Sequence, residues 1–235
     1  MCVQYLLQTS IKKVEKIFDT FSSQEMEWGA HFFPRSTAPV MIERKNERVL
    51  GPMSFGLIAP WETNPIPKQV FHNARSETVH LKPTFRDSFK NRRCIVPITH
   101  FIEWVGIPGK KKTIQFFCKA NPLLGVAGIW NRWVSPVGQI TYSYSLITKN
   151  PDPRILEQGH DRMPVILKPE NYNEWLQPNS QNRLHEIIAD SPNLFWESSD
   201  FNKDDYSKSP LMSLGLERKG RDEGPNAKTS SSLDA

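Results

Sequence analysis

The sequence predicts an α+β fold in which strands outnumber helices. Short apolar or alternating runs, separated by Pro and Gly turns, fill residues 26–130 and are typical of β-strands. Apolar residues at helical spacing are confined to one segment near the N-terminus and two segments beyond residue 167. Because the expected strands rarely alternate with helices, an α+β arrangement is favoured over a parallel α/β sheet.

The expected elements follow in chain order. "CVQYLL" indicates a short strand, and "TSIKKVEKIFDTF" indicates a helix with Thr9 or Ser10 as its N-cap. Further strands are expected at residues 38–44, 52–60, 92–98, 100–105, 112–120, 123–130 and 138–149. "GIPGKKK" has the composition of a hairpin loop between two of them. Two later helices are expected, one opening in "KPENYNEWL" with Pro169 in its first turn and one in "SQNRLHEIIAD".

The composition is that of one globular domain followed by a polar tail. The chain has 235 residues, of which 38% are hydrophobic, including 13 Phe and 7 Trp. This is enough apolar material for a core. From Ser213 onward no aromatic residue occurs, so we expect a domain over residues 1–212 and a disordered tail over residues 213–235. The net charge of +5 permits polyanion binding.

Cysteine usage and the N-terminus indicate an intracellular protein. The three cysteines are an odd number without framework spacing, which indicates a reducing compartment. No signal peptide is evident, and no apolar run is long enough to span a membrane. "GIPGK" lacks the P-loop spacing, and no CxxC pair occurs. We therefore expect a soluble protein with no membrane partner, no cofactor and no metal.

Cys2 becomes an unusual nucleophile if Met1 is removed. The chain would then begin with an α-amine and a thiol on adjacent carbons, whose ordinary pKa values are roughly 7.7–8.0 and 8.5. An amine condenses with an aldehyde to a Schiff base, and the neighbouring thiol can close that imine to a five-membered thiazolidine. The alternative is that Cys2 is only a small residue in a first strand.

The segment "FHNARSET", residues 71–78, places Asn73, Arg75 and Glu77 at alternate positions. In an extended segment an amide, a guanidinium and a carboxylate would share one face and form a site. Alternatively, these three side chains are only solvated at the protein surface. A basic stretch with one acid, Asp87, follows and either contacts DNA or forms a solvated face; its members are Lys82, Arg86, Lys90, Arg92 and Arg93.

Two later segments offer acid–base groups. Glu103 lies between Ile102 and Trp104 in "HFIEWV", so its carboxylate either points outward or is held in a low-dielectric pocket, as an acid–base catalyst requires. "QGHDRMPVIL" contains His160, a residue type suited to acid–base chemistry, and Arg162, a residue type that suits phosphate. A loop histidine without a function is the alternative for His160.

Together these segments resemble the SOS-response-associated peptidase (SRAP) family. The family pattern runs from Cys at position 2 through N-A-R-x-E-T and R-C-x-x-P with a following E-W pair to H-x-R-M-P. Its counterparts in this chain are Cys2, "NARSET", "RRCIVPITHFIEW" and "GHDRMP". "FGLIAPW" resembles W-G-L-I-P-x-W, and "FPRSTAP" resembles R-Y-N-x-A-P. The similarity extends over roughly residues 2–212.

The resemblance implies a fold and a function. The implied fold is mixed, mostly antiparallel and partly barrel-like β structure with flanking helices. The implied function is binding of single-stranded DNA, followed by attack of Cys2 on the ring-opened aldehyde of an abasic site. The product is a thiazolidine DNA–protein cross-link that shields the lesion. A monomer is expected, located in the cytoplasm, at the nucleoid if the source is bacterial or in the nucleus if it is eukaryotic.

The resemblance also implies residue roles. Asn73 would hold the N-terminal residue or the opened sugar, and Glu103 would shuttle protons at the sugar hydroxyl and the imine. His160 would be the acid–base partner, including in reversal of the cross-link. Arg75 and Arg162 would hold the flanking phosphates. In addition, an exposed aromatic such as Trp61 could stack on a base, although burial of this side chain is the default expectation.

The chain departs from the family pattern near the nucleophile. The usual M-C-G-R-F is "MCVQY" here, so Val3 and Gln4 replace Gly and Arg, and His100 replaces the Gly before the aromatic of the E-W motif. Two other functions stay open. One is a cysteine-type peptidase that uses Cys2, Glu103 and His160, or an autopeptidase that uses them to cleave only the bond after Met1. The other is a non-catalytic DNA-binding module. An abasic-site lyase activity is a possible side reaction of the cross-linker.

Overall fold

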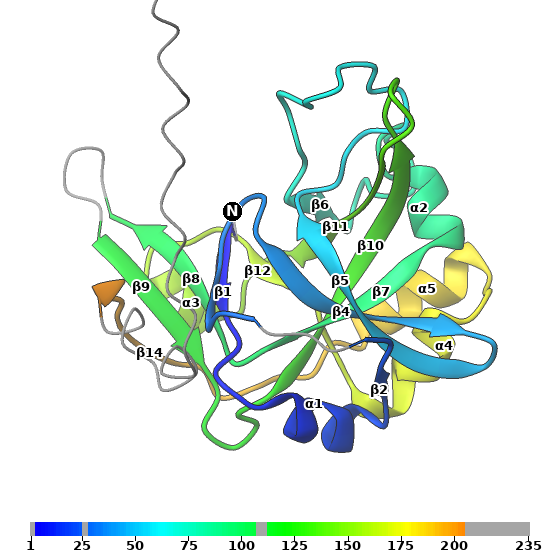
Figure 1. Ribbon diagram of the computed structural model, residues 1–235. Helices are drawn as coiled ribbons and strands as arrows, with labels where there is room; N and C mark the ends of the chain where they lie inside the picture. The colour runs from blue at the N-terminus through cyan, green and yellow to red at the C-terminus, as the bar shows by residue number, and fades with distance from the viewer. Residues whose placement is uncertain (1–2, 25–27, 107–111, 205–235) are drawn as a thin grey trace, which may run out of the picture.

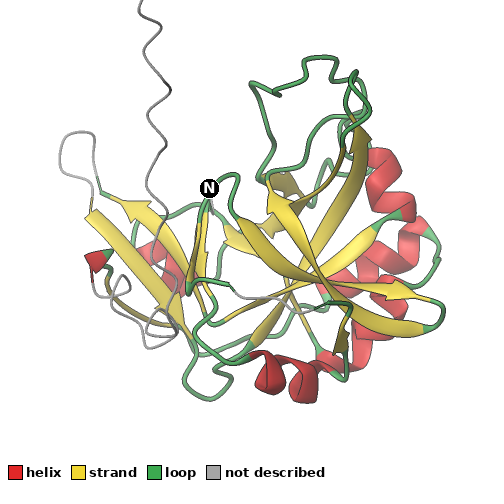
Figure 2. Ribbon diagram, viewed as in Figure 1, coloured by secondary structure: helices red, strands yellow, loops and turns green. Residues whose placement is uncertain are grey.

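The computed structural model describes residues 3–24, 28–106 and 112–204. Two β-sheets lie side by side, and most helices lie around the outside of the larger one (Figures 1 and 2). The smaller sheet has five strands in the order β14-β9-β8-β1-β3, all antiparallel. Its strands are β1 (Gln4–Leu6), β3 (His31–Phe32), β8 (His100–Val105), β9 (Lys112–Phe117) and β14 (Glu197–Asp200).

The larger sheet contains a closed ring of strands. Its main order is β12-β11-β10-β7-β4-β5-β2, with β13 on β10 and β6 on β11. Parallel pairing of β5 with β11 joins Phe55 to Tyr144 and closes the ring β11-β10-β7-β4-β5. The strands are β2 (Phe21–Ser22), β4 (Thr37–Arg44), β5 (Glu47–Phe55), β6 (Asn73–Arg75), β7 (Arg93–Ile98), β10 (Leu124–Val134), β11 (Ile140–Lys149), β12 (Met163–Pro164) and β13 (Ile166–Leu167). The predicted α+β class, mostly antiparallel and partly barrel-like, is confirmed.

Short helices cover the ring, and the three predicted from sequence are present. The first helix is capped by Ser10, which accepts a hydrogen bond from the backbone N–H of Lys13, and it ends at Asp19, whose φ of 49° is left-handed. α2 and α3 were not expected, because each spans only one or two turns. The helical elements are α1 (Ile11–Phe18), α2 (Arg86–Asn91), α3 (Pro153–Glu157), the 3₁₀ turn η1 (Pro169–Asn171), α4 (Tyr172–Leu176) and α5 (Gln181–Ala189).

The end of β5 differs from the sequence prediction, whereas the β8–β9 hairpin agrees with it. β5 ends at Phe55 rather than running to residue 60, because Gly56 has a φ of +111°. A Cβ at Gly56 would lie 2.6 Å from Cγ2 of Val70, so only glycine fits there. β8 and β9 pair antiparallel up to Val105 opposite Lys112, as the hairpin prediction requires, although residues 107–111 of the loop lie outside the described residues.

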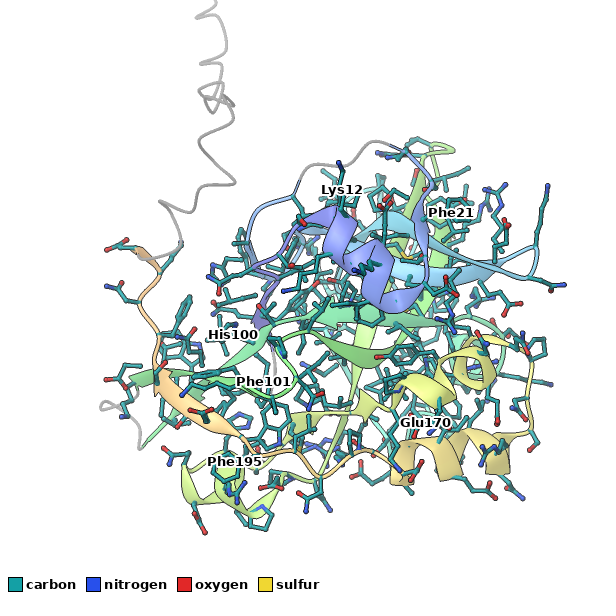
Figure 3. The ribbon with its side chains drawn as sticks, turned by 90° about the horizontal axis from the view of Figure 1, so that it is seen from below. Lys12, Phe21, His100, Phe101, Glu170 and Phe195 are labelled. Carbon is teal, nitrogen blue, oxygen red and sulfur yellow. The ribbon has the colours of Figure 1, made fainter. Side chains whose placement is uncertain are left out.

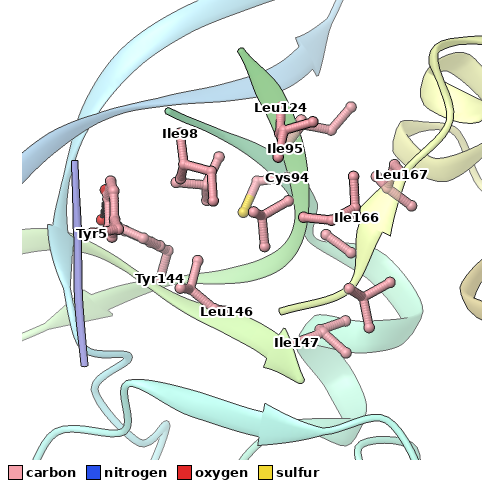
Figure 4. Packing of buried hydrophobic residues seen from close by; sticks show 14 of the residues in the cluster. Tyr5, Cys94, Ile95, Ile98, Leu124, Tyr144, Leu146, Ile147, Ile166 and Leu167 are labelled. Carbon is pink, nitrogen blue, oxygen red and sulfur yellow. Dashed lines mark hydrogen bonds between the residues drawn. The ribbon is translucent and has the colours of Figure 1, made fainter. Parts of the chain in front are cut away.

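Tyrosine and phenylalanine side chains pack where the two sheets meet. The Tyr5 hydroxyl of β1 is 2.5 Å from the Tyr144 hydroxyl of β11, and both side chains are buried (Figure 4). Tyr5 stacks on Phe32, and Tyr144 stacks on Phe55. Burial raises the pKa of Tyr144, so both groups stay neutral and share a hydrogen bond. This contact fixes β1, which carries the N-terminus, against the barrel strand β11.

Candidate active site

Glu103 is buried because of its register on β8. Gln4 pairs with Ile102 and Tyr5 with Phe101, so side chains of β1 and β8 alternate together between the two faces. Phe101 and Tyr5 face the core, and Glu103 is two residues from Phe101 on the same face. Its side chain is 1% exposed. Of the two sequence interpretations, the outward orientation is therefore wrong and the buried one is confirmed.

His160 meets Glu103 across the two sheets. Its Nε2 lies 2.8 Å from Oε2 of Glu103, and the imidazole is 7% exposed. On the other side of the ring, Nδ1 lies 2.8 Å from the backbone oxygen of Arg162, with the Arg162 backbone nitrogen farther away at 3.3 Å. The shorter contact is with a carbonyl, which only accepts, so we assign a proton to Nδ1. The close Nε2–Oε2 contact then requires one more proton, on the ring or on the carboxyl.

The arrangement is an acid–base pair. One proton held between an imidazole and a carboxylate can be given to a leaving oxygen or taken from an attacking amine. The buried position strengthens the electrostatic interaction within the pair, because little water screens it. The pair lies beside β1, whose first residue, Gln4, directly follows Val3. Cys2 itself lies outside the described residues.

Arg162 is held inside the protein. Its guanidinium donates to both carboxylate oxygens of Glu77 at 2.8 and 2.9 Å, to Oδ1 of Asn150 at 3.0 Å and to the backbone oxygen of Thr148 at 2.6 Å. The side chain is 9% exposed, and its hydrogen bond to Glu77 holds the pKa of that carboxyl below its usual range. These contacts fix the carbonyl that orients His160. The phosphate role of Arg162 stays a prediction.

β6 carries the other two predicted residues. It pairs parallel with β11, placing Asn73 opposite Leu146 and Arg75 opposite Thr148. The oxygen and nitrogen of the Asn73 amide are buried and have no hydrogen-bond partner among the described residues. Arg75 is exposed and forms no ion pair within the described part of the chain.

The expectation of one continuous extended face from Asn73 to Glu77 is wrong. The strand ends at Arg75, whose carbonyl accepts hydrogen bonds from the backbone N–H groups of Thr78 and Val79. This turn carries Glu77 away from the strand to meet Arg162. β11 nevertheless unites two of the four motifs, because it pairs with β6 at one position and with β12, directly after His160 and Arg162, at another.

Several other groups near the site were not predicted. Oε1 of Gln4, the residue at the position of the family arginine, lies 2.8 Å from Nε2 of His31. Nδ1 of His100 forms a hydrogen bond with the Thr99 hydroxyl. Burial lowers the pKa of His100 to about 4, so this ring is neutral at physiological pH. Pairings between distant strands create these contacts, and no periodicity in the sequence signals them. Trp61 is 57% exposed, so the default expectation of burial is wrong for this side chain.

The remaining cysteines do not compete as nucleophiles. Cys94 and Cys118 are buried and unbridged, and burial raises the pKa of the Cys94 thiol. Within the described ranges, no cluster of three or more His, Cys, Asp and Glu side chains has the geometry to hold a metal ion. None of the helices in the described residues has the length and apolar character needed to cross a membrane.

The chain is similar to known proteins over most of its length. The sequence profile of the family described as SOS response associated peptidase (SRAP) matches residues 1–200. Abasic site processing protein YoaM from Bacillus subtilis is 30% identical over 184 residues, covering 77% of this chain and 81% of the relative. Abasic site processing protein YoqW, also from Bacillus subtilis, is 36% identical over 148 residues, which is 63% of this chain and 66% of the relative. The YoqW match thus spans slightly less than two thirds of that protein.

A vertebrate relative and two solved structures extend the comparison. Abasic site processing protein HMCES from Xenopus tropicalis is 32% identical over 174 residues, covering 61% of this chain and 52% of the relative. A crystal structure from Bacteroides thetaiotaomicron has a TM-score of 0.75 at 23% identity, covering 89% of this chain and 96% of the other. One from Bordetella bronchiseptica has a TM-score of 0.74 at 26% identity, covering 86% and 100%. With a family profile that covers residues 1–200 and the same ordered motifs around one buried Glu–His pair, the chain belongs to the SRAP family.

Proposed function

We propose that this protein binds single-stranded DNA and forms a covalent thiazolidine cross-link between Cys2 and the ring-opened aldehyde of an abasic site. The cross-link shields the lesion from strand cleavage. The observation that carries the proposal is the buried Glu103–His160 pair beside the strand that begins at Gln4. The names of the relatives, which process abasic sites, support the same substrate.

The chemistry requires two steps and a proton carrier. After removal of Met1, the α-amine of Cys2 adds to the aldehyde carbon, and loss of one water leaves an imine. The Cys2 sulfur then forms a bond to the imine carbon, and the thiol proton passes to the imine nitrogen, which closes the ring. The first step needs a base for the amine proton and an acid for the departing water. Glu103 and His160, which hold a proton between them, supply both.

The remaining predicted residues position the DNA. A buried amide without a partner costs about 1–3 kcal/mol, so the Asn73 side chain is suited to a group that arrives with the substrate or with the N-terminal residue. Arg75 is exposed, so a phosphate can reach its guanidinium. Arg162 already has a carboxylate partner in Glu77, so we assign it mainly to positioning His160 through its backbone oxygen. Contact with a phosphate is its secondary role. The protein acts as a monomer in the cytoplasm, nucleoid or nucleus, where DNA is available.

A peptidase would use the same three residues differently. A thiolate of Cys2 paired with His160 resembles the arrangement of a cysteine-type hydrolase, and the family description uses the word peptidase. Such an enzyme cleaves internal peptide bonds, whereas the cross-linker requires a free α-amine and an aldehyde. A non-catalytic DNA-binding module would bind abasic and intact strands without forming a covalent adduct.

The test is incubation of the full chain with single-stranded DNA carrying one abasic site, followed by a denaturing gel. We expect a denaturant-resistant adduct that is absent with intact DNA and absent for Cys2→Ala. Cys2→Ser is the matched variant, because it keeps the α-amine and a small second residue but loses the thiol. It should give little stable adduct, an imine that borohydride traps, and some strand cleavage by β-elimination.

Three outcomes would decide against the proposal. An equally stable adduct with Cys2→Ala would remove Cys2 as the nucleophile. No trappable imine with Cys2→Ser, despite removal of Met1 and normal DNA binding, would contradict the amine-first order. Cleavage of an internal peptide bond without any DNA adduct would favour the peptidase.

A further inference from the structure

Two adjoining hollows lie between the β6–α2 segment and α5, beside the site described above, with which they share Glu77. One has a volume of about 610 Å³, and its lining includes Glu77, Lys149 and His185. The other has a volume of about 480 Å³, and its lining includes Arg86 and Lys90 of α2 together with the start of α5. His80 and Gln181 line both hollows. We call the combined feature the α2–α5 groove.

The carboxylates of the groove are already neutralised by arginines. Glu77 is held by the fork of Arg162. Asp87 is paired with Arg92. Burial alone would raise the pKa of Asp87, but hydrogen bonds from Arg92 and Asn91 outweigh it and hold the pKa below the usual value. These two carboxylates are the acidic groups in the lining of the two hollows. The acids therefore contribute little uncompensated negative charge to the groove.

The cations of the groove are not neutralised in this way. Lys149, Arg86 and Lys90 line it, and within the described residues none of them forms an ion pair with a carboxylate. The nearby Arg93 is different: it is 3% exposed and donates to the backbone oxygens of Trp175 and Phe89. The basic stretch of the sequence thus divides into a structural part and a part that faces the groove.

Two histidines add hydrogen-bonding capacity. The rings of His80 and His185 lie edge to face with centroids 4.7 Å apart. Nδ1 of His80 and Nε2 of His185 are buried and have no hydrogen-bond partner among the described residues. A neutral imidazole nitrogen that carries its proton donates to an anionic oxygen, and a protonated ring also contributes positive charge.

The groove is continuous with the candidate active site. It begins at Ser76 and Glu77, directly after the exposed Arg75 of β6. Glu77 binds Arg162, whose backbone oxygen holds His160. A polyanion that reaches His160 past Arg75 therefore arrives at a hollow with uncompensated cations.

We propose that the α2–α5 groove binds the sugar–phosphate backbone of the DNA strand on one side of the abasic nucleotide. This inference rests on the proposed function, which it deepens by giving the flanking strand a defined path. Phosphodiesters are the ligands that lysine and arginine recognise without regard to base sequence. The groove thus adds affinity for longer strands and takes no part in the chemistry at Cys2.

The test compares the double variant Arg86→Ala/Lys90→Ala with a matched control, Lys12→Ala/Lys16→Ala. Both pairs are exposed cations one helical turn apart. Lys12 lies on α1 (Figure 3), which is well separated from α2 (Figure 1). Binding is measured by fluorescence anisotropy in a Cys2→Ala background, so that no thiazolidine forms, and the abasic site is first reduced with borohydride, so that it offers no aldehyde to the remaining α-amine. Three abasic single strands serve as probes: a short one, one extended only on the 5′ side and one extended only on the 3′ side.

We expect the Arg86/Lys90 variant to weaken binding of one extended strand about tenfold. The slope of log Kd against log salt for that strand should fall by about 1.4, because each lost phosphate contact on a single strand contributes about 0.7. The short strand and the other extended strand should bind as before, and the Lys12/Lys16 control should leave all three unchanged. Equal weakening of all three strands, the same loss in the control, or no loss at all would overturn the proposal.

The two proposals fail separately. The cross-linking rate on the short strand is measured with Cys2 present, for the wild type and for the Arg86/Lys90 variant. No adduct on the short strand would refute the proposed function, while the binding data on extended strands would still decide the groove. An unchanged adduct rate together with unchanged binding of both extended strands would refute the groove and leave the cross-linker intact.

Discussion

The candidate active site has two halves that are built differently. In the closed half, Glu103 binds His160, the Arg162 carbonyl holds His160, and Glu77 binds the Arg162 guanidinium. In the open half, the Asn73 amide is buried without a partner among the described residues, and the exposed Arg75 has no carboxylate partner there. Both halves are attached to β11, through β12 and β6 respectively.

This difference separates side chains that are already bonded to one another from side chains that are available to a ligand. In the closed half, the terminal nitrogens of Arg162, both ring nitrogens of His160 and Oε2 of Glu103 have partners inside the protein, so their geometry is fixed before any substrate arrives. Nε of Arg162 has no partner among the described residues. The open half leaves hydrogen-bonding capacity unused at a cost to the folded state, and such a cost is recovered when a ligand binds. The closed half should therefore control the rate and the stability, and the open half should control affinity.

The largest expected effect is on the chemical step. Glu103→Gln keeps the shape of the side chain but removes the carboxylate that shares a proton with His160. We expect the rate of cross-linking at saturating DNA to fall about 100-fold or more, with the dissociation constant unchanged. The control is Glu47→Gln, at the exposed start of β5, which should keep the wild-type rate. A Glu103→Gln rate within a few-fold of wild type would show that the closed half does not carry the chemistry.

The second effect concerns stability. Glu77→Gln removes the partner of a buried guanidinium, so we expect the free energy of unfolding to fall by about 1–2 kcal/mol, a range reduced because the Glu77 side chain is 46% exposed. The matched control is Glu186→Gln. Its partner, Arg183, is 39% exposed and also pairs with Glu174. This variant should change the free energy of unfolding by less than about 0.5 kcal/mol. Urea unfolding measures both, and equal losses would contradict the distinction.

The same variant has a pH signature. Arg162 holds the pKa of Glu77 below its ordinary value of 4.5, so the ion pair stabilises the folded state above that pH. The stabilisation is lost as pH falls below 4.5 and through the lower folded-state pKa. Glu77→Gln should therefore differ most from wild type near neutrality and converge with it in acid. A stability difference that stays constant down to acid pH would exclude this pair as the cause.

The third effect is unusual because removal of a buried polar side chain should not lower the free energy of unfolding. Asn73→Ala removes a buried amide that has no hydrogen-bond partner among the described residues, so the free energy of unfolding should stay the same or rise, while binding of abasic DNA weakens about tenfold. Asn171→Ala is the control, because that buried amide donates to Asp190 at 3.0 Å. Asn171→Ala should lose about 1 kcal/mol of stability and bind DNA normally. Destabilisation by Asn73→Ala would show that its amide already has a partner.

The smallest expected effect is that of Arg75→Ala. The side chain is exposed, so unfolding should change by less than about 0.5 kcal/mol. Binding of single-stranded DNA should weaken a few-fold, and the log–log salt slope should fall by about 0.7. Titrations at several salt concentrations measure both quantities. A weaker affinity with an unchanged slope would mean that Arg75 contacts something other than a phosphate.

The sequence was informative where local pattern decides the structure. The Ser10-capped helix, the β8–β9 hairpin and the strands around Cys94 follow from periodicity, caps and turn residues. The two-residue strands β12 and β13 carry too few residues for a pattern. α2 has only six residues, most of them polar, so it shows no clear helical periodicity. These elements form because β11, β10 and the core hold them in place.

Site residues were predictable by type and order but not by partner. Glu103 and His160 are 57 positions apart. They meet because β8 pairs with β1, β12 pairs with β11, and Tyr5 of β1 bonds Tyr144 of β11. The Glu77–Arg162 pair was missed for the same reason, because the turn after Arg75 breaks the alternation that had placed Glu77 beside Asn73. The domain end at residue 212 and the tail lie beyond the described residues and stay predictions.

Intact mass spectrometry of the adduct shows whether the α-amine and thiol of Cys2 close a ring on an abasic aldehyde. Ring closure gives one species whose mass equals the chain without Met1 plus the abasic strand, less one water. Borohydride should leave that mass unchanged, because a thiazolidine has no C=N bond, whereas the Cys2→Ser adduct should gain two hydrogens. A wild-type adduct that retains Met1, or one that borohydride reduces, would contradict the account.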